Sequence, residues 1–311
     1  MAIVANTFLT FSAIGNREDL IDQIYNVDPV DTPFFKMCPK VKASSTLHEW
    51  QTQALAAAAN NAQIQADDVA FAAVTPTVRE NCRTQISRKE VVIGGTQEEV
   101  EKAGRESEMT YQLMLKNKEL NRDIEVVLTG NRAQVTGNSA TAPQLRPLEA
   151  WYVTNDSRGA GGADGTSSAA ATDGTQRPLT EALLKTVLQL CYTAGGDPDT
   201  IMPGPFNKQV ISAFAGNATR FIEAGSGKLV TSIEIYKGDF GTQKVVPNRF
   251  SRDRTLHVLQ SDMWAVATLR PKKTKDLAKT GDAEKAMIIT EYALEARNEK
   301  SSGVVADLTT S

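Results

Sequence analysis

Polar and apolar residues alternate along residues 77–93, and this period of two predicts a β-strand. One side would carry Arg79, Asn81, Arg83 and Gln85, and the other Val78, Cys82 and Ile86. An outgoing arm over 46–55 and a tip over 56–73, rich in Ala, Asn, Gln and Asp, complete a long hairpin. Because two strands alone are marginally stable in water, we expect a neighbouring subunit to support this hairpin.

Helical spacing of apolar residues over 96–129 predicts the longest helix of the chain, about 50 Å at ~1.5 Å per residue. Its apolar face would consist of Met109, Leu113, Leu120, Ile124, Val127 and Leu128. Thr96 and Glu99 form a capping box, Gly130 supplies a stop, and Gly104 is a place for a bend.

The first 45 residues read as an extended arm, because Pro29, Pro33 and Pro39 push their predecessors out of helical geometry. Within this arm, the spacing of Leu20, Ile21 and Ile24 predicts a short helix over 17–25.

The second half of the chain mixes helices and strands. Residues 155–177 hold no Ile, Val, Leu, Met or aromatic residue, so we expect a surface excursion without its own core. A helix over 180–194 follows, with Leu183, Leu184, Val187, Leu188 and Cys191 facing inward. Short strands are then predicted at 201–202, 229–236, 244–246, 255–259, 264–270 and 287–296. Without a βαβ rhythm, the fold class is α+β.

Composition and charge exclude several classes of protein. The chain has 311 residues, of which 41% are hydrophobic and 23% charged, as in folded globular proteins. Its 34 Lys and Arg against 37 Asp and Glu argue against a protein that grips DNA by excess positive charge. We find neither a signal peptide nor a membrane span in the sequence.

Candidate chemistry is scarce, and we assign no catalytic, cofactor-binding or metal-ligating residue. The three cysteines, Cys38, Cys82 and Cys191, form no CxxC pair and read as small core residues. The two histidines, His48 and His257, lie on strand-like stretches and read as packed or interfacial residues. We therefore expect no cofactor and no enzymatic activity.

A glycine-rich turn at 225–228 fails as a phosphate-binding loop. Ile222 stands where the first glycine is needed, and Leu229 follows Lys228 in place of Ser or Thr.

Two basic clusters read as solvated faces, with weak contact to an acidic neighbour or to nucleic-acid phosphate as the alternative. They consist of Arg249, Arg252 and Arg254, and of Arg270, Lys272, Lys273 and Lys275.

Six stretches, taken in their order along the chain, resemble the major capsid protein of tailed bacteriophages with the Hong Kong 97-type fold. They are DPVDTPFFKM (28–37), TLHEWQTQAL (46–55), RPLTEALLK (177–185), GDFGTQKVVPNRF (238–250), LAKTGDAEKAMI (277–288) and EYALEARNEKSSGVVADL (291–308). No single stretch is diagnostic, and their number and order carry the resemblance.

The resemblance implies a division into named parts. These are an N-terminal arm (1–45), an E-loop hairpin (46–93), a spine helix with the start of the P-domain (94–150), an A-domain (151–260), and return strands of both domains (261–311). In that fold the hairpin of one subunit lies across the helix-bearing domain of its neighbour.

The resemblance also implies a structural protein that assembles as pentamers and hexamers into an icosahedral shell around double-stranded DNA. The expected partners are further copies of the chain, a portal, scaffold and decoration proteins, and packaged DNA bound without sequence specificity; no membrane is expected. Assembly would take place in the host cytoplasm. Because Met1 directly precedes the arm, we expect any scaffold to be a separate protein.

The candidate contacts between subunits are Trp50, Arg79, Arg83, Glu98 and Glu101. Arg79 and Arg83 share one side of the return arm, and acidic residues crowd the start of the long helix. The alternative is that both charged sets are solvated faces. Two other functions stay open: a non-viral nanocompartment shell with the same fold, distinguished by its cargo, and a nucleotide-utilising enzyme, which needs an anion-binding loop.

Overall fold

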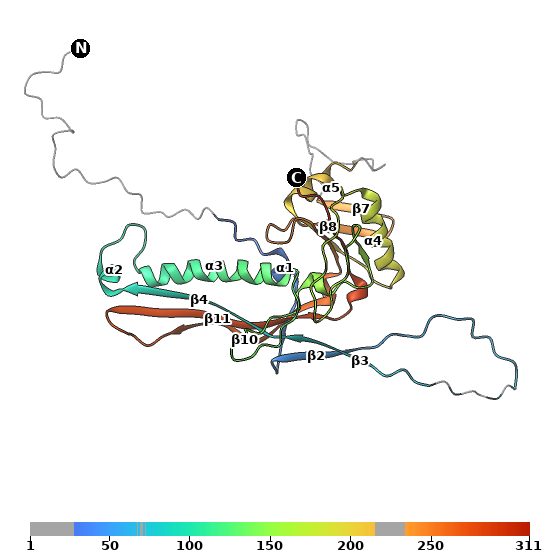
Figure 1. Ribbon diagram of the computed structural model, residues 1–311, viewed down its shortest axis with the longest axis horizontal. Coiled ribbons are helices and arrows are strands. Elements are labelled where there is room, and N and C mark those ends of the chain that lie inside the picture. The colour runs from blue at the N-terminus through green and yellow to red at the C-terminus, as the bar shows by residue number, and fades with distance from the viewer. Residues whose placement is uncertain (1–27, 67, 69–70, 72, 215–233) are drawn as a thin grey trace, which may run out of the picture.

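The computed structural model describes residues 28–66, 68, 71, 73–214 and 234–311. Two bodies of structure, each built around one sheet, share the chain between them, because residues 264–296 return from the second body to the first (Figure 1). The mixture of helices with mainly antiparallel sheets confirms the α+β class. The helix predicted over 17–25 and the glycine-rich turn at 225–228 lie outside the described residues.

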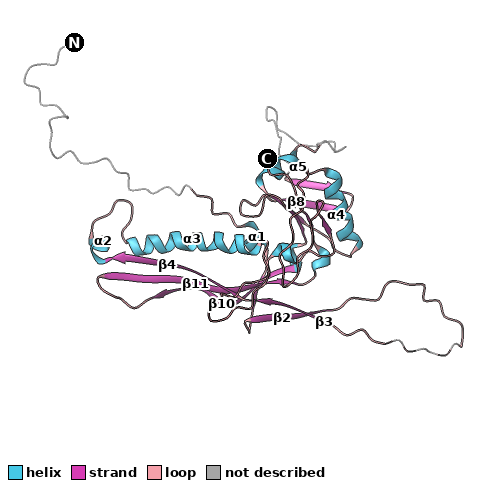
Figure 2. Ribbon diagram, in the orientation of Figure 1, coloured by secondary structure: helices cyan, strands magenta, loops and turns pink. Residues whose placement is uncertain are grey.

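The first body is a four-stranded sheet with one long helix, α3 (Glu108–Leu128), along one face (Figure 2). The strand order is β1 (Lys40–Lys42), β10 (Trp264–Asp276), β11 (Ala283–Ala296) and β4 (Gln85–Gly94). Leu120, Ile124 and Leu128 bury the inner side of α3, as their spacing predicts. A short helix, α1 (Pro33–Met37), packs against α3 from the arm.

The second body is a six-stranded sheet in the order β5, β12, β9, β6, β8, β7. Its strands are β5 (Asp156–Ser157), β12 (Gly303–Val305), β9 (Leu256–Leu259), β6 (Thr200–Pro203), β8 (Gly241–Val245) and β7 (Ile235–Gly238). The second body also contains the helices α4 (Glu181–Thr193) and α5 (Pro205–Ser212). Single 3₁₀ turns lie at Leu148–Ala150, Ser261–Met263 and Glu299–Ser301. The helix predicted over 180–194 is confirmed, and the side chain of Thr180 caps it by accepting from the Leu183 amide.

The prediction of one long helix over 96–129 is wrong for residues 96–107. The segment is divided into α2 (Gly95–Glu99) and α3, with an irregular connection over 100–107. Thr96 caps neither helix; Ser107 caps α3 by accepting from the Thr110 amide. Gly104 takes a positive φ of 72° in the connection, so the chain turns there where a bent helix was expected.

The return arm predicted as one strand over 77–93 is two strands with different partners. β3 (Val78–Arg83) pairs with β2 (Leu47–Thr52), whereas β4 pairs with β11. Thr84 lies between them, buried, and donates through its hydroxyl to Glu291 at 2.8 Å. The hairpin therefore ends at Arg83, because the following residues complete the first sheet.

Four of the arginines and lysines assigned to solvated faces are engaged inside the chain, and one of them, Arg270, pairs with Glu291 at 2.6 Å. Arg252 pairs with Glu149 at 2.6 Å and with Asp173, and Arg254 pairs with Asp307 at 3.0 Å. Lys272 donates to two asparagines of α3, Asn117 and Asn121. For these residues the prediction is wrong, because their acceptors lie far away in sequence.

Two apolar clusters fill the interior. One lies between α3 and the first sheet and includes Phe34 and Trp264; the other includes Leu184 and Val258. Cys38 and Cys82 lie in the first cluster and Cys191 in the second, all free and buried, so the prediction of core cysteines is confirmed.

Candidate subunit interface

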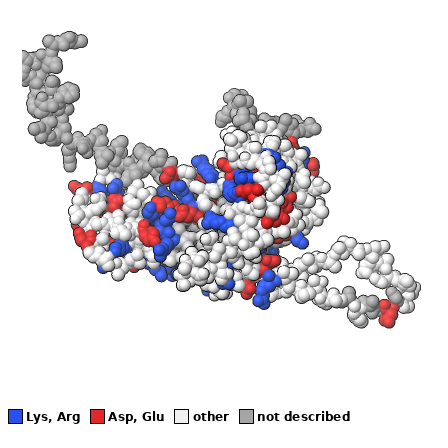
Figure 3. Space-filling view, in the orientation of Figure 1, with Lys and Arg blue, Asp and Glu red and all other residues white. Residues whose placement is uncertain are grey.

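The hairpin of β2 and β3 projects away from the rest of the chain (Figure 1). The described residues between its strands are exposed and include large apolar side chains: Leu55 is 96% exposed and Phe71 94%. Ile64 and Val74 are likewise exposed. The space-filling view shows few charges on the projecting part (Figure 3). Apolar side chains on an extended arm of this kind are typical of a surface that is buried by another molecule.

The base of the hairpin is attached to the first body by two aromatic residues. The indole N–H of Trp50 donates to the carbonyl oxygen of Ala296 at 2.9 Å, and its ring centroid lies 5.6 Å from that of Trp151. His48 contacts the Glu295 carboxylate at 2.9 Å. Burial opposes ionisation of Glu295, but its bonds to Arg297 and His48 outweigh this and lower its pKa.

The structure thus shows that Trp50 and His48 make contacts within the chain. From the sequence, His48 could be either a packed or an interfacial residue, and Trp50 was a candidate contact between subunits. The partner of Trp50, Ala296, is separated by 246 positions, and no local pattern reveals it. The expectation that Trp50 contacts another subunit stays a prediction.

Arg79 and Arg83 lie on the return strand β3, as predicted. Arg79 is exposed and reaches Glu49 of the paired strand only at 3.9 Å. Arg83 is half-buried, and its backbone amide donates to the side-chain oxygen of Gln134 at 3.1 Å. The guanidinium of Arg79 is therefore only weakly engaged within the chain.

The acidic residues before and within α3 divide into two groups. The Glu98 carboxylate accepts from the backbone amides of Glu108 and Met109, and bonds from the Ser107 side chain and these amides lower its pKa. Glu108 is buried beside Arg105, and its pKa is lowered chiefly by the bond from Gln112. Both are thus used inside the chain.

Glu99, Glu101 and Glu106 form the second group, and all three are exposed. They lie around α2, at the opposite end of the first body from the hairpin (Figure 1). Contact between these carboxylates and the arginines of β3 would therefore require two copies of the chain.

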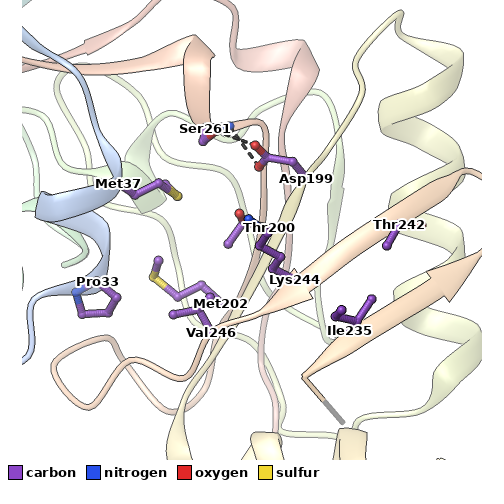
Figure 4. Close-up of a pocket in the computed structure, with 10 residues that line it drawn as sticks. All are labelled: Pro33, Met37, Asp199, Thr200, Met202, Ile235, Thr242, Lys244, Val246 and Ser261. Atoms are coloured by element: carbon purple, nitrogen blue, oxygen red, sulfur yellow. Dashed lines mark hydrogen bonds between the residues drawn. The ribbon is translucent and has the colours of Figure 1, made fainter. Parts of the chain in front are cut away.

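One cavity of about 380 Å³ lies between α1 and the second sheet (Figure 4). Its wall is mostly apolar, with Met37 of α1 and Met202 of β6, and its one acid, Asp199, accepts from the Ser261 hydroxyl and amide. The lining residues include no histidine or cysteine.

A serine–histidine contact lies elsewhere in the second body. The Ser251 hydroxyl is 3.1 Å from Nε2 of His257, but burial lowers the pKa of His257 to about 3. A base this weak does not activate a hydroxyl at neutral pH. Across the residues that the structure describes, no His, Cys, Asp and Glu side chains are grouped to hold a metal ion. No helix in the described ranges is long and apolar enough to cross a bilayer.

Comparison with known proteins matches nearly the whole chain to phage capsid proteins. The model of the SU10 major capsid protein family matches residues 3–309. The major capsid protein of Escherichia phage Phieco32 is 28% identical over 338 aligned positions, which cover 96% of each chain.

Solved capsid structures share the fold at low sequence identity. The capsid asymmetric unit of cyanophage A-1(L) has a TM-score of 0.67 at 14% identity and covers 97% of this chain and 99% of that one. The mature capsid of bacteriophage PhiM1 has a TM-score of 0.63 at 9% identity, covering 99% and 98%. These likenesses confirm the Hong Kong 97-like capsid fold. The family match spans nearly the whole sequence, and the chain therefore belongs to the SU10 major capsid protein family.

Proposed function

We propose that copies of this chain assemble as pentamers and hexamers into an icosahedral shell that encloses double-stranded DNA. The observation that carries the proposal is the hairpin, whose base is attached to the first body but whose projecting part exposes large apolar side chains. A second copy of the chain would remove these side chains from water, at ~25 cal/mol for each Å² of apolar surface. Repeated around a ring, this contact links each subunit to the next.

Within the proposed shell, Arg79 and Arg83 of one subunit face Glu101 and its acidic neighbours of another. Each such exposed pair contributes only about 0.2–1 kcal/mol, so the pairs select register more than they hold the shell together. The division of the chain into arm, E-loop, spine helix, P-domain and A-domain belongs to the same proposal, with the E-loop hairpin ending at Arg83.

Further parts of the proposal are a separate scaffold, a portal, decoration proteins, assembly in the host cytoplasm and the absence of enzymatic turnover. A DNA cargo distinguishes this function from that of a non-viral nanocompartment, which would enclose an enzyme. The near-neutral net charge of −3 fits a container that is filled with DNA by another machine.

The test is deletion of residues 56–73, which removes the tip of the hairpin and leaves its paired strands. The deletion variant should keep the circular dichroism spectrum of the folded chain and yield no closed shells by negative-stain microscopy. The matched control replaces the deleted residues with a Gly/Ser segment of equal length, which keeps the reach but not the apolar side chains. Normal shells from either variant would contradict the role of the hairpin.

A further inference from the structure

The carboxyl group of Glu125 is a junction between three segments of the chain. Glu125 lies near the end of α3 and is fully buried. One oxygen accepts from the backbone amide of Phe34 at 2.8 Å, and the other from the amide of Phe35 at 2.8 Å. The side-chain amide of Asn248 also donates to it, at 2.7 Å. The arm, the long helix and a loop of the second body therefore meet at one side chain.

The neighbours of Glu125 repeat this three-way arrangement. Arg122, one turn earlier in α3, lies 3.7 Å from Asp28 of the arm and over the ring of Phe250, at 5.5 Å from its centroid. The Asn248 side chain is itself held, since its oxygen accepts from the Phe250 amide at 2.9 Å. The junction is thus built on both sides of the carboxyl group.

Glu125 forms no ion pair among the described residues. Lys40 is the cation that acts on it through space, and the Lys40 ammonium donates to the Phe35 carbonyl oxygen. Burial raises the pKa of Glu125, while the bonds from Phe35, Phe34 and Asn248 lower it in part. Each bond named above is one that the carboxyl group accepts. The side chain therefore bears the cost of desolvation and accepts two bonds from the arm and one from the second body.

A second buried glutamate gives the contrast. Glu149 is also buried, yet it pairs with Arg252 at 2.6 Å and accepts from the Thr255 hydroxyl at 2.8 Å. Its partners belong to the second body. Loss of that pair leaves Arg252 with Asp173 as its remaining acid, at the exposed end of the guanidinium, whereas loss of the Glu125 charge leaves only amides that can turn to water if the arm moves away.

We propose that Glu125 is a conformational clasp: it attaches the arm at Phe34 and Phe35 to the long helix and to the second body, and the arm detaches there without unfolding of either body. The residues before Phe34 leave the body from a point that this clasp fixes. A detached arm would be free to leave in another direction, which gives a single sequence two ways to present its N-terminal segment.

The test measures hydrogen exchange of a peptide that covers residues 32–38, in the unassembled full chain at neutral pH. Glu125→Gln should speed exchange of the Phe34 and Phe35 amides about tenfold or more, because the neutral side chain offers one acceptor oxygen in place of two. The melting temperature should stay within about 2 °C of the natural chain, since the buried charge is also gone. Glu149→Gln should do the reverse, lowering the melting temperature and leaving exchange at Phe34 and Phe35 unchanged.

Glu125→Asp provides a second variant, which keeps the charge but shortens the side chain by one methylene. It should also speed exchange at the two amides. Unchanged exchange in both variants would show that the carboxyl group does not hold the arm. If the melting temperature falls as far in Glu125→Gln as in Glu149→Gln, Glu125 stabilises the whole fold and does not act locally on the arm. That result would overturn the proposal. Because the chain is unassembled, neither result depends on whether it forms shells.

Discussion

The indole nitrogen of Trp50 lies 2.9 Å from the carbonyl oxygen of Ala296, so the first strand of the hairpin is bonded to the end of β11. The same ring packs at 5.6 Å from both His48 and Trp151. Contacts at the base therefore set the direction in which the hairpin leaves the body.

Removal of this attachment should reduce the yield of assembled shells while the chain still folds. Trp50→Phe keeps an aromatic ring and loses one hydrogen bond, which should cost about 1 kcal/mol of unfolding free energy in urea. Trp50→Ala also loses the packing and should cost about 2–3 kcal/mol, because the ring is only half-buried. We expect shell yield to fall in the same order. Equal yields from both variants at unchanged stability would contradict an orienting role.

A charge exchange tests the proposed register between subunits. Arg83→Glu should reduce assembly, most strongly at low ionic strength where charges are least screened. Glu101→Arg in the same chain should restore part of the loss, as judged by sedimentation of assembled particles. Assembly of Arg83→Glu at the normal rate in low salt would leave both charged sets as solvated faces.

The buried His257 predicts that stability falls in acid. Its pKa is about 3 in the folded chain, against ~6.5 when unfolded, so the unfolded state binds the proton more tightly. Its contribution is complete above pH ~6.5 and is lost at about 1.4 kcal/mol per pH unit as the pH falls toward 3. Urea unfolding at pH 7 and at pH 5 gives the loss of unfolding free energy between these two pH values. This loss should be smaller in His257→Asn than in the natural chain, because the variant has no imidazole to protonate. Parallel loss of stability in both proteins would contradict the assignment.

Thiol reagents should leave the folded chain unmodified. Burial raises the pKa of Cys38 to about 12, of Cys82 to about 11 and of Cys191 to about 12. Since the thiolate is the reactive form, a folded sample at pH 8 should show almost no labelling by iodoacetamide in mass spectrometry. Labelling at all three cysteines in denaturant is the control. Fast labelling of one cysteine in the folded chain would indicate local opening around it.

Elements with local signals were predictable from the sequence, and those that depend on distant partners were not. The period of Leu184, Val187 and Leu188 defined α4, and the strands from β6 to β11 fell near their predicted places. Predictions across residues 229–233 lie outside the described residues. The division of the long helix was missed, because the Glu98 carboxylate stabilises the start of α3 across ten positions.

The excursion over 155–177 shows the same limit. The lack of large apolar residues correctly predicted a segment without its own core. The segment is held instead by polar contacts to distant parts of the chain. Asp307 accepts from the amides of Gly159 and Gly174 and pairs with Arg254. Asp307 takes a positive φ of 59° there, a conformation that no local pattern announced. The sequence predicted the hairpin but placed its end ten residues too far along the chain, and the attachment of Trp50 and the bonds of Glu125 required the structure.

The place of β12 has a consequence for the order of events during synthesis. Residues 303–305 lie between β5 and β9, and they pair with strands that the ribosome produced almost 150 and about 50 residues earlier. Until translation has passed Val305, β5 therefore has no strand to pair with and one edge of β9 stays open. An unfinished chain displays a hairpin but lacks a completed second body, and this delay separates the making of subunits from their joining.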